Sequence, residues 1–539
     1  MALQTPETSM SWRELMRPVW RMVEFDGREV TILVIYTLAL GVVSAAVPFA
    51  SQVLINQAAF TGAAPPIIAL SLIVFGVLLI GSFIRLFQIR VAALIAKRAF
   101  VRSALRGAQS LLDHPSRAYE FDDREIGNRF FDVMTFQVAF GVLAAEGLGV
   151  IVLSVVGIII LALYHPLFFA FSSVVLLLCI IVIGMMAKRG VERSYARSTN
   201  KYRTAYWISQ VAENRSLLRQ TKANRIIQER TDDLSQDYVR TYFDYLRVLL
   251  WQSGGLFFIQ AAASAAFFGL GGWLVVRGQL NLGQLVAAEI VLLANMTALT
   301  RFYFYLDSFY ETVVAAWKVG ELTEVEGEAV VSPVQATMPN IQGFTLTSPL
   351  LEEPLKVARG DIIVLRGQSR RNCSVLLRDI AASDKGDAAS ITWHSDQPVS
   401  RQSSIDLMLY LARPAILRMT LAENLSLLSD ADTMGEARET VLDVPLIRPA
   451  ERSRADMMLD DTDMSISDRA RYAAARVFMT KRPVVLVDMF FNLMEIADQV
   501  TFVTEFKRRF PDCILIINAF DTAIDPLASR IVQVRGDAS

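Results

Sequence analysis

Cysteine is scarce in this sequence, and its scarcity limits the chemistry to be expected. The three cysteines, Cys179, Cys373 and Cys513, are far apart and follow no metal-ligand spacing. An excess of positive charge is also lacking, because the net charge is -1, so nothing indicates nucleic acid as a partner. No cleavable signal peptide is recognisable before the first long apolar run, which begins near Val30. We therefore expect no cysteine-bound metal and no nucleic-acid partner.

Long apolar runs are absent after residue 310 but frequent before it. Hydrophobic residues make up 53% of the chain and charged residues 20%, the average expected of a membrane half joined to a soluble half. A helix that spans a bilayer needs about 20 mostly apolar residues. Six stretches meet this requirement, at about 30–55, 66–93, 136–163, 166–187, 249–276 and 283–306. The sequence therefore predicts an integral membrane protein.

Positive charge in the loops predicts the orientation of these helices. Seven Lys and Arg residues lie between 97 and 129, and more follow the fourth stretch from Lys188 onward. The short turns after the first and third stretches contain none. Because cytoplasmic loops are enriched in Lys and Arg, we expect both termini and the C-terminal domain in the cytoplasm. The membrane is expected to be a bacterial-type inner membrane or a plasma membrane.

The segment before the first stretch, residues 1–28, has an amphipathic pattern. Basic residues occupy one helical face, and the opposite face carries Trp12, Leu15, Met16, Val19, Trp20 and Val23. Such a helix suits the cytoplasmic surface of the membrane. The alternative is a soluble helix packed on the cytoplasmic domain.

The pattern changes after a segment at 321–340 that contains Glu, Gly and Pro and predicts a linker. Beyond it, helical patterns alternate with short apolar runs, at Ile362–Leu365, Leu407–Leu411, Val484–Val487, Ile514–Ile517 and Ile531–Val534. Apolar runs without polar alternation are typical of buried parallel strands. We therefore expect a membrane domain at 29–320 and an α/β domain at 341–539.

This order of elements resembles an ABC exporter half-transporter of the type 1 fold. Phe121 to Arg129 resembles the first intracellular loop of that family, and Glu213 followed by Thr221-Lys222-Ala223 resembles the second. Leu282 to Ala287 resembles the start of helix 6 in exporters of the haemolysin-secretion type. The resemblance implies an all-α transmembrane domain of six helices, a C-terminal α/β nucleotide-binding domain, and a homodimer or heterodimer in membrane lipid.

The phosphate-binding loop of that family needs glycines, a Lys for the phosphates, and a Ser or Thr for Mg²⁺. The corresponding segment reads Gly367-Gln368-Ser369-Arg370-Arg371-Asn372-Cys373-Ser374. Gly367 and Ser374 match the pattern, but Asn372 replaces the second glycine and Cys373 replaces the lysine. Two arginines also stand where the loop residues are usually small.

The other nucleotide motifs are altered as well. Asp488 follows a predicted strand and could hold Mg²⁺ through water, but Met489 stands where a Glu should polarise the attacking water. Loss of a general base costs about 10²–10⁴ in rate. The signature motif keeps Ser465, but its glycines and glutamine are replaced in the run Ile466-Ser467-Asp468. The positions of the Mg²⁺ sensor, the switch histidine and the adenine-stacking aromatic hold Ala412, Ala519 and Ser348.

Three interpretations of the surviving positions remain open. Gly367, Ser369, Ser374, Ser465 and Asp488 satisfy only turns and helix caps, retain nucleotide binding without turnover, or support genuine catalysis at this chain's own site. In the second case Arg370 or Arg371 would contact phosphate. We predict no catalytic residue, and we expect ATP with Mg²⁺ as a cofactor only under the second and third interpretations.

Charged and polar residues inside the predicted spans form a separate group. Arg85 and Gln88 lie in the second stretch, Glu146 in the third and Glu289 in the sixth. A charge at the bilayer centre costs at least about 2.5–3.5 kcal/mol. We therefore expect these groups either to line a substrate cavity or to form internal ion pairs and reach the interface.

Two functions are consistent with these patterns. The chain is either the degenerate half of an exporter that works with a partner half-transporter, or an inactive membrane scaffold or regulator. The haemolysin-type resemblance suggests a protein or peptide as substrate. In the family, the phosphate loop of one chain faces the signature of the other, and both are altered here, which favours the scaffold. The helix and loop order favours the exporter.

Overall fold

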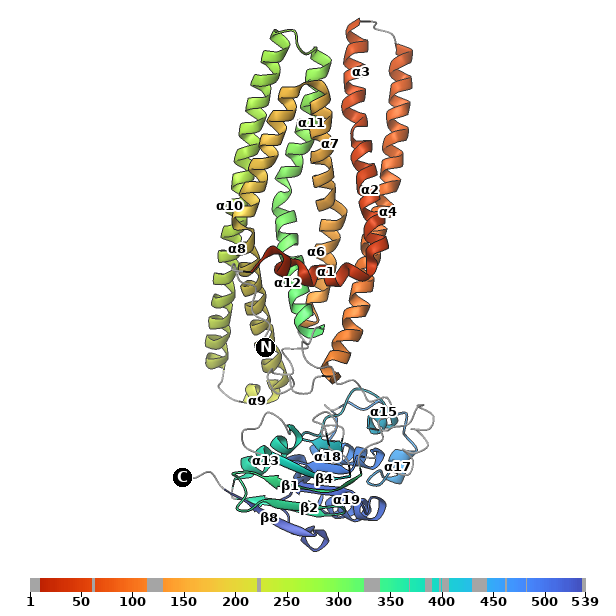
Figure 1. Cartoon of the computed structure of the whole chain (residues 1–539), viewed down its shortest axis with the longest axis vertical. Coiled ribbons are helices and arrows are strands. Elements are labelled where there is room, and N and C mark those ends of the chain that lie inside the picture. Colours follow the sequence, from red (N-terminus) through yellow and green to blue (C-terminus); the bar gives the residue numbers. More distant parts are fainter. Residues whose placement is uncertain are drawn as a thin grey trace. The chain divides into compact units, whose positions relative to one another are not determined.

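The computed structural model describes residues 10–60, 64–113, 129–220, 224–323, 340–367, 369–382, 390–396, 399, 407–428, 444–460, 463–480 and 482–535. The chain divides into two compact units, Met1–Val331 and Ser332–Ser539. The first unit is helical, and the second combines helices with β-sheet (Figure 1). We call them the membrane unit and the α/β unit.

Long helices build the membrane unit. They are α1 (Trp12–Val23), α2 (Gly27–Ser44), α3 (Ala46–Phe60), α4 (Ala64–Asp113), α6 (Asp132–Val142), the π-helix η3 (Leu143–Gly147), α7 (Leu148–Tyr164), α8 (Pro166–Glu213), α9 (Arg215–Gln220), α10 (Asn224–Val276), α11 (Leu282–Thr300) and α12 (Phe302–Thr323). Five helical stretches among the described residues are long and apolar enough to cross a membrane, and Leu282–Met296 is a shorter apolar helix. The six predicted stretches therefore all form helix, but the sixth is shorter than expected, because a turn at Arg301 separates α11 from α12.

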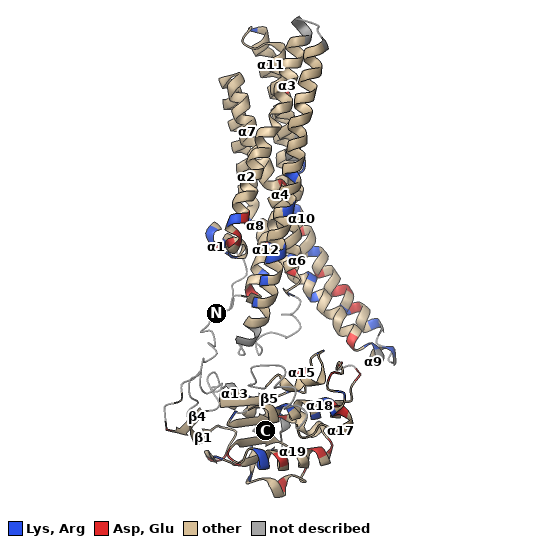
Figure 2. Ribbon diagram, turned by 90° about the vertical axis from the view of Figure 1, so that its right-hand side faces the viewer, with Lys and Arg blue, Asp and Glu red and all other residues tan. Residues whose placement is uncertain are grey.

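Three of the helices extend far beyond the thickness of a membrane. Helix α4 has 50 residues, α8 has 48 and α10 has 53. At a rise of 1.5 Å per residue such helices are about 70–80 Å long, whereas a bilayer core is about 30 Å thick. Charged residues gather in the half of the membrane unit nearest α9, and the other half is almost free of them (Figure 2). The long loops predicted by the sequence are therefore largely helical extensions.

The residues of the predicted apolar face of helix α1 lie in two different environments. A capping box between Ser11 and Glu14 starts the helix. Leu15, like the valines at positions 19 and 23, is buried against the membrane helices, and its carbonyl oxygen accepts a hydrogen bond of 3.0 Å from Nε1 of Trp317 in α12. Trp12 and Trp20 are exposed. The aliphatic side chains therefore pack on the membrane unit, and only the tryptophans remain for a lipid surface.

A five-stranded parallel sheet forms the centre of the α/β unit. Its order is β5 (Met408–Leu411), β6 (Val484–Val487), β7 (Ile514–Asn518), β3 (Ile362–Gly367), β8 (Arg530–Val534). Each strand coincides with one of the five predicted apolar runs. Val484 faces one hydrophobic core and Val485 faces the other. Burial on both faces explains why these strands lack polar alternation.

A second sheet and several helices cover the parallel sheet. The antiparallel sheet has the order β2 (Leu355–Ala358), β1 (Ile341–Thr347), β4 (Ser390–Ser395), and the helices are α13 (Arg370–Ala382), α15 (Leu421–Ser426), α17 (Pro449–Arg452), α18 (Ile466–Ala475) and α19 (Ile496–Arg509). Alternate residues of β1, β2 and β4 differ in burial. This sheet is half-exposed, and the search for continuous apolar runs therefore missed it.

Parts of three predicted segments lie outside the described residues. These parts are residues 121–128 of the first loop motif, residues 221–223 of the second, and residues 324–339 of the linker. Helix α12 continues through Thr323, three residues into the predicted linker at 321–340.

Candidate functional site

The carboxylate of Asp488 lies at the end of β6 and is held by four hydrogen-bond donors. Its Oδ1 accepts bonds from the Ser374 hydroxyl at 2.7 Å, the Asn518 amide at 2.9 Å and the Met489 backbone N–H at 2.7 Å. Its Oδ2 accepts a bond of 3.0 Å from the Tyr410 hydroxyl. A carboxylate offers about four lone-pair sites. Oδ1 is therefore fully occupied in the side chain, which is only 5% exposed, while Oδ2 keeps one lone pair.

These contacts bear on Mg²⁺, which the predicted site would hold through Asp488 and Ser374. The Ser374 hydroxyl donates its proton to the carboxylate, while its oxygen lone pairs stay available. No group of three or more His, Cys, Asp or Glu residues that could hold a metal occurs in the part of the chain that the structure describes. The pair therefore offers a cation only the free lone pairs of Oδ2 and of the serine oxygen.

Tyr410 and Asn518 are members of this site that the sequence analysis did not identify. Tyr410 lies in β5 and Asn518 ends β7, and both strands pair in parallel with β6. Residues at the carboxyl ends of neighbouring parallel strands come together at one sheet edge. The polar side chains at the ends of the predicted strands were the signal that could have identified them.

The altered phosphate loop directs its central residue into the core. Cys373 is 1% exposed and packs with Leu376 and Leu377. Burial, together with the nearby Asp488 charge, raises the pKa of the Cys373 thiol to about 11. An uncharged thiol in the core therefore stands at the position of the lysine in the expected phosphate-loop pattern.

The neighbours of Cys373 have structural roles. Asn372 is buried and donates a bond of 2.9 Å to the Arg535 carbonyl. A Cβ atom on Gly367 would lie 2.8 Å from the Val534 carbonyl oxygen, so close packing against β8 requires the glycine. Ser369 is half-buried, and its carbonyl accepts a bond of 3.2 Å from the Asn372 N–H. These contacts place Gly367, Ser369 and Asn372 in the packing and turns of the loop.

Ser465 caps the helix that carries the altered signature motif. Its hydroxyl accepts a bond of 3.0 Å from the Asp468 N–H and donates one of 2.7 Å to Oδ2 of Asp468. The first turn of α18 therefore already holds an anion of its own, the Asp468 carboxylate. A helix N-terminus attracts negative charge, and a phosphate approaching here would meet the repulsion of this carboxylate.

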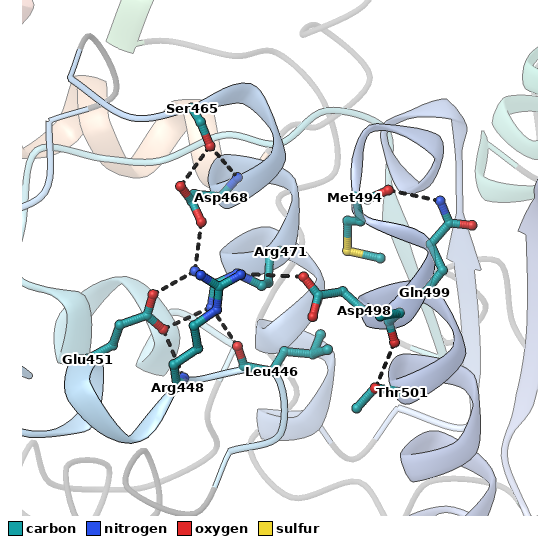
Figure 3. Close-up of polar contacts among 11 residues, drawn as sticks. Leu446, Arg448, Glu451, Ser465, Asp468, Arg471, Met494, Asp498, Gln499 and Thr501 are labelled. Atoms are coloured by element: carbon teal, nitrogen blue, oxygen red, sulfur yellow. Dashed lines mark hydrogen bonds and ion pairs between the residues drawn. The ribbon is translucent and has the colours of Figure 1, made fainter.

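Arg471, which lies three residues after Asp468 in α18, links the signature segment to the rest of the α/β unit. It is 1% exposed, and its guanidinium binds Glu451 through two bonds of 2.6 and 2.8 Å and Asp468 through one of 2.8 Å. It also donates to the Leu446 carbonyl at 2.6 Å, and Asp498 lies 3.9 Å from its Nε (Figure 3). Burial alone would lower the pKa of Arg471, but the hydrogen bonds that Arg471 donates to Glu451 and Asp468 raise it.

The remaining motif positions offer no polar group to a nucleotide. Ala519, at the switch position, is 0% exposed and belongs to a hydrophobic core. Ala412, at the sensor position, is exposed. Ser348 is buried in a turn, where its hydroxyl accepts a bond of 3.3 Å from the Leu350 N–H.

The charged residues of the membrane helices do not form one cluster. Arg85 and Glu146 lie 3.8 Å apart, and Tyr305 donates a bond of 3.1 Å to Glu146, which stands in the π-helix η3. Glu146 also borders a groove of about 650 Å³ between α4 and α6. Gln88 is buried and donates to Thr37 at 2.8 Å. Glu289 is half-buried on α11 and does not join this ion pair.

Comparisons with known proteins relate this architecture to one family. A solved structure of a bacterial ABC exporter of the Atm1 family with ATP bound is similar, with a TM-score of 0.78 and 14% sequence identity, over 95% of this chain and 94% of that chain. A search of curated proteins gave no significant match. The model of the ABC transporter transmembrane region matches residues 30–299, half of the sequence. The chain therefore has the ABC exporter fold, spans a membrane with its helices and belongs to the ABC transporter transmembrane-region family.

Proposed function

We propose that this chain is a degenerate ABC half-transporter, which forms a dimer through its membrane helices and does not turn over ATP at its own site. The exporter fold and the family support the transport class. The haemolysin-type pattern at Leu282–Ala287 favours a protein or peptide as substrate. The proposed domains are the elbow helix at 1–28, the transmembrane domain at 29–320, the linker at 321–340 and the nucleotide-binding-like domain at 341–539.

The surroundings of Asp488 support the proposal that turnover is lost. Four protein donors compete with Mg²⁺ for the carboxylate that would hold it. Met489, the next residue, has a thioether that cannot accept a proton from water, and Cys373 supplies no positive charge to phosphate. Each defect alone would lower the rate, and the three lie in one site.

A second function, a membrane scaffold or regulator, is favoured by a different observation. Asp468 places a carboxylate at the N-terminus of α18, bonded to Ser465 and Arg471. This helix end is the part of the chain that would serve the phosphate of a partner. If neither the phosphate loop of this chain nor its signature helix serves a nucleotide, an intact partner gains no working site that is shared between the two chains. The chain would then act through binding alone.

ATP turnover and partner recovery test the two parts separately. The purified full chain in lipid should hydrolyse ATP at the background rate, and Asp488→Asn should leave this rate unchanged. Turnover that disappears in Asp488→Asn would refute the loss of catalysis. Cross-linking in native membranes followed by mass spectrometry should recover an intact ABC half-transporter. Recovery of this chain only with proteins of other families would support the scaffold.

A further inference from the structure

A small pocket with three arginines in its lining lies among α1, α4 and α12 of the membrane unit. Its volume is about 30 Å³. The polar and charged residues of its lining are Arg21 of α1, Arg102, Ser103 and Arg106 of α4, and Thr323 of α12. Among the described residues, no carboxylate belongs to this lining. The pocket therefore offers positive charge and hydroxyl groups, the combination that suits an anion.

The ring of Phe25 keeps two of these arginines close together. Phe25 lies in the 3₁₀-helix η1 (Glu24–Asp26), which follows α1, and its ring is exposed. The guanidinium carbon of Arg106 lies 4.7 Å from the ring centroid, and that of Arg102 lies 5.8 Å from it. A cation is attracted to the face of an aromatic ring. The ring thus holds two like charges, four residues apart on one helix, although such charges repel each other.

Arg102 is fixed through one end of its guanidinium. Its Nη2 donates to the Met22 carbonyl at 2.8 Å and to the buried carboxylate of Asp26 at 2.5 Å. Within the described part of the chain, its Nη1 makes no hydrogen bond. A guanidinium has five N–H donors in a rigid fork. Arg102 is therefore held in place and still has donors for another acceptor.

Arg106 supplies positive charge that no carboxylate of this region balances. Asp26 accepts bonds from both Arg98 and Arg102, and Glu29 pairs with Arg98 at 2.7 Å. These two carboxylates are thus already shared by two arginines. The guanidinium of Arg106 forms neither an ion pair nor a hydrogen bond with any residue that the structure describes. Its only recorded contact of this kind is the ring of Phe25.

The surroundings of the pocket are those of a membrane surface. Trp20 of α1 is exposed, and so is Leu105, the neighbour of Arg106 on α4. Aromatic side chains gather where a membrane meets water. Figure 2 shows α1 near the boundary between the half of the membrane unit in which charged residues gather and the half that is almost free of them. We therefore expect the pocket at the level of the lipid headgroups, on the side that the loop charges indicate as cytoplasmic.

We propose that this pocket binds the phosphate group of an anionic phospholipid through Arg102 and Arg106, with the Ser103 hydroxyl as a further donor. Arginine binds phosphate through charge-assisted and often paired hydrogen bonds, and basic pockets between membrane helices bind anionic headgroups. The volume has room for about two water-sized groups. The pocket therefore takes phosphate oxygens and not a whole lipid, and the acyl chains lie outside it, along the exposed Leu105.

A bound phosphate would join α1 to α4, because Arg21 of the same lining belongs to α1. Its expected effect is stabilisation of the membrane unit that depends on the charge of the lipid and not on nucleotide. This inference does not depend on the proposed function, since the pocket requires neither a partner nor ATP.

Thermal unfolding of the purified full chain in lipid nanodiscs tests the proposal. Phosphatidylglycerol replaces phosphatidylcholine stepwise at constant ionic strength, and the unfolding midpoint of the wild type should rise to a plateau. Arg106→Gln, a change at an exposed side chain, should fold and should need about tenfold more phosphatidylglycerol for half of the rise, the factor expected for one lost hydrogen bond between charged groups. Arg106→Lys keeps the charge but not the fork, so its response should lie between the two.

Arg240→Gln is the matched control, because it removes the same charge from an exposed site on α10, outside the pocket. Its response to phosphatidylglycerol should equal that of the wild type. An equal weakening in Arg240→Gln and Arg106→Gln would show a general effect of surface charge and would overturn the proposal, as would a wild-type midpoint that does not change with phosphatidylglycerol. Inorganic phosphate added to phosphatidylcholine nanodiscs should not raise the midpoint. A rise as large as that with phosphatidylglycerol would identify a site for soluble anions, and the assignment to lipid would be wrong.

Discussion

Each of the two units buries a carboxylate near the end of a helix or strand, but the two carboxylates differ in their hydrogen-bond partners. In the α/β unit, four donors from three neighbouring elements and the adjacent backbone surround Asp488. In the membrane unit, Oδ1 of Asp132 has partners while Oδ2 has none in the described residues. Burial is similar, at 5% and 1% exposure. The two carboxylates therefore differ in the number of donors that hold them, not in their burial.

This contrast changes how the residual motif positions are interpreted. Asp488 and Ser374 are the residue types expected of a Mg²⁺ site, yet their side chains bond to each other at 2.7 Å. Asp132 belongs to no motif, and its Oδ2 has no partner in the described residues. Residue type alone therefore does not identify a ligand site, because the available lone pairs depend on the neighbours.

The largest loss of stability is expected at Arg471. Arg471→Ala should destabilise the α/β unit by about 3–5 kcal/mol, because removal of one partner leaves Glu451 and Asp468 as uncompensated, partly buried charges. Hydrogen exchange of α18, followed by mass spectrometry on the full chain, should show the loss. Arg469→Ala, two residues away on the same helix, is the control. Equal protection of α18 in both variants would contradict the role assigned to Arg471.

A smaller loss is expected at Asp488, and it would sharpen the contrast with Asp132. Asp488→Ala removes the acceptor of the bonds from Ser374, Tyr410 and Asn518 and should cost about 3 kcal/mol, whereas Tyr410→Phe removes one bond to a charged acceptor and should cost about 1.5–3 kcal/mol. Asp132→Asn should cost less than Asp488→Ala, because fewer donors depend on the Asp132 carboxylate. Hydrogen exchange of β6 and α6 measures both effects. The comparison fails if β6 tolerates Asp488→Ala better than α6 tolerates Asp132→Asn.

Acid should weaken the cluster that Arg471 forms with Glu451 and Asp468. Although burial raises the pKa of Glu451 and Asp468, the hydrogen bonds from Arg471 outweigh it and lower both pKa values. A carboxylate with a lowered folded-state pKa stabilises the fold above its ordinary pKa of about 4, and this contribution is lost as the pH falls through the lower folded-state value. Protection of α18, corrected for intrinsic exchange, should therefore decrease below about pH 4 in the wild type. In Arg471→Ala this decrease should be smaller, and an equal decrease would count against the assignment.

The smallest effect is expected from repair of the phosphate loop. Cys373→Lys should give no ATPase activity above background, because the side chain enters a core of leucines and Met489 still provides no base. Cys373→Ser, which introduces no charge, is the control for changes in packing. Measurable turnover in Cys373→Lys alone would show that the loop can direct this side chain to phosphate.

Local patterns in the sequence predicted most of the architecture. Apolar length located the membrane helices, and five apolar runs located the parallel strands, because burial on both faces leaves a continuous signal in the chain. The altered motif positions at Cys373, Met489 and Asp468 were also evident from residue type. The half-exposed antiparallel sheet was missed, since its alternation is weaker than a continuous run.

Tertiary structure decided which polar groups meet. Asp488 bonds to Ser374, 114 residues earlier in the sequence, and Asn518, 30 residues later, completes the same group. Arg85 meets Glu146 in the same way, across two helices. Hydrophobic periodicity repeats every few residues and can be read locally, whereas a hydrogen bond needs two specific atoms within about 3 Å. Only the packing of strands and helices brings such atoms together. The sequence therefore specified the helices and strands, and the fold determined how many hydrogen-bond donors each buried carboxylate meets.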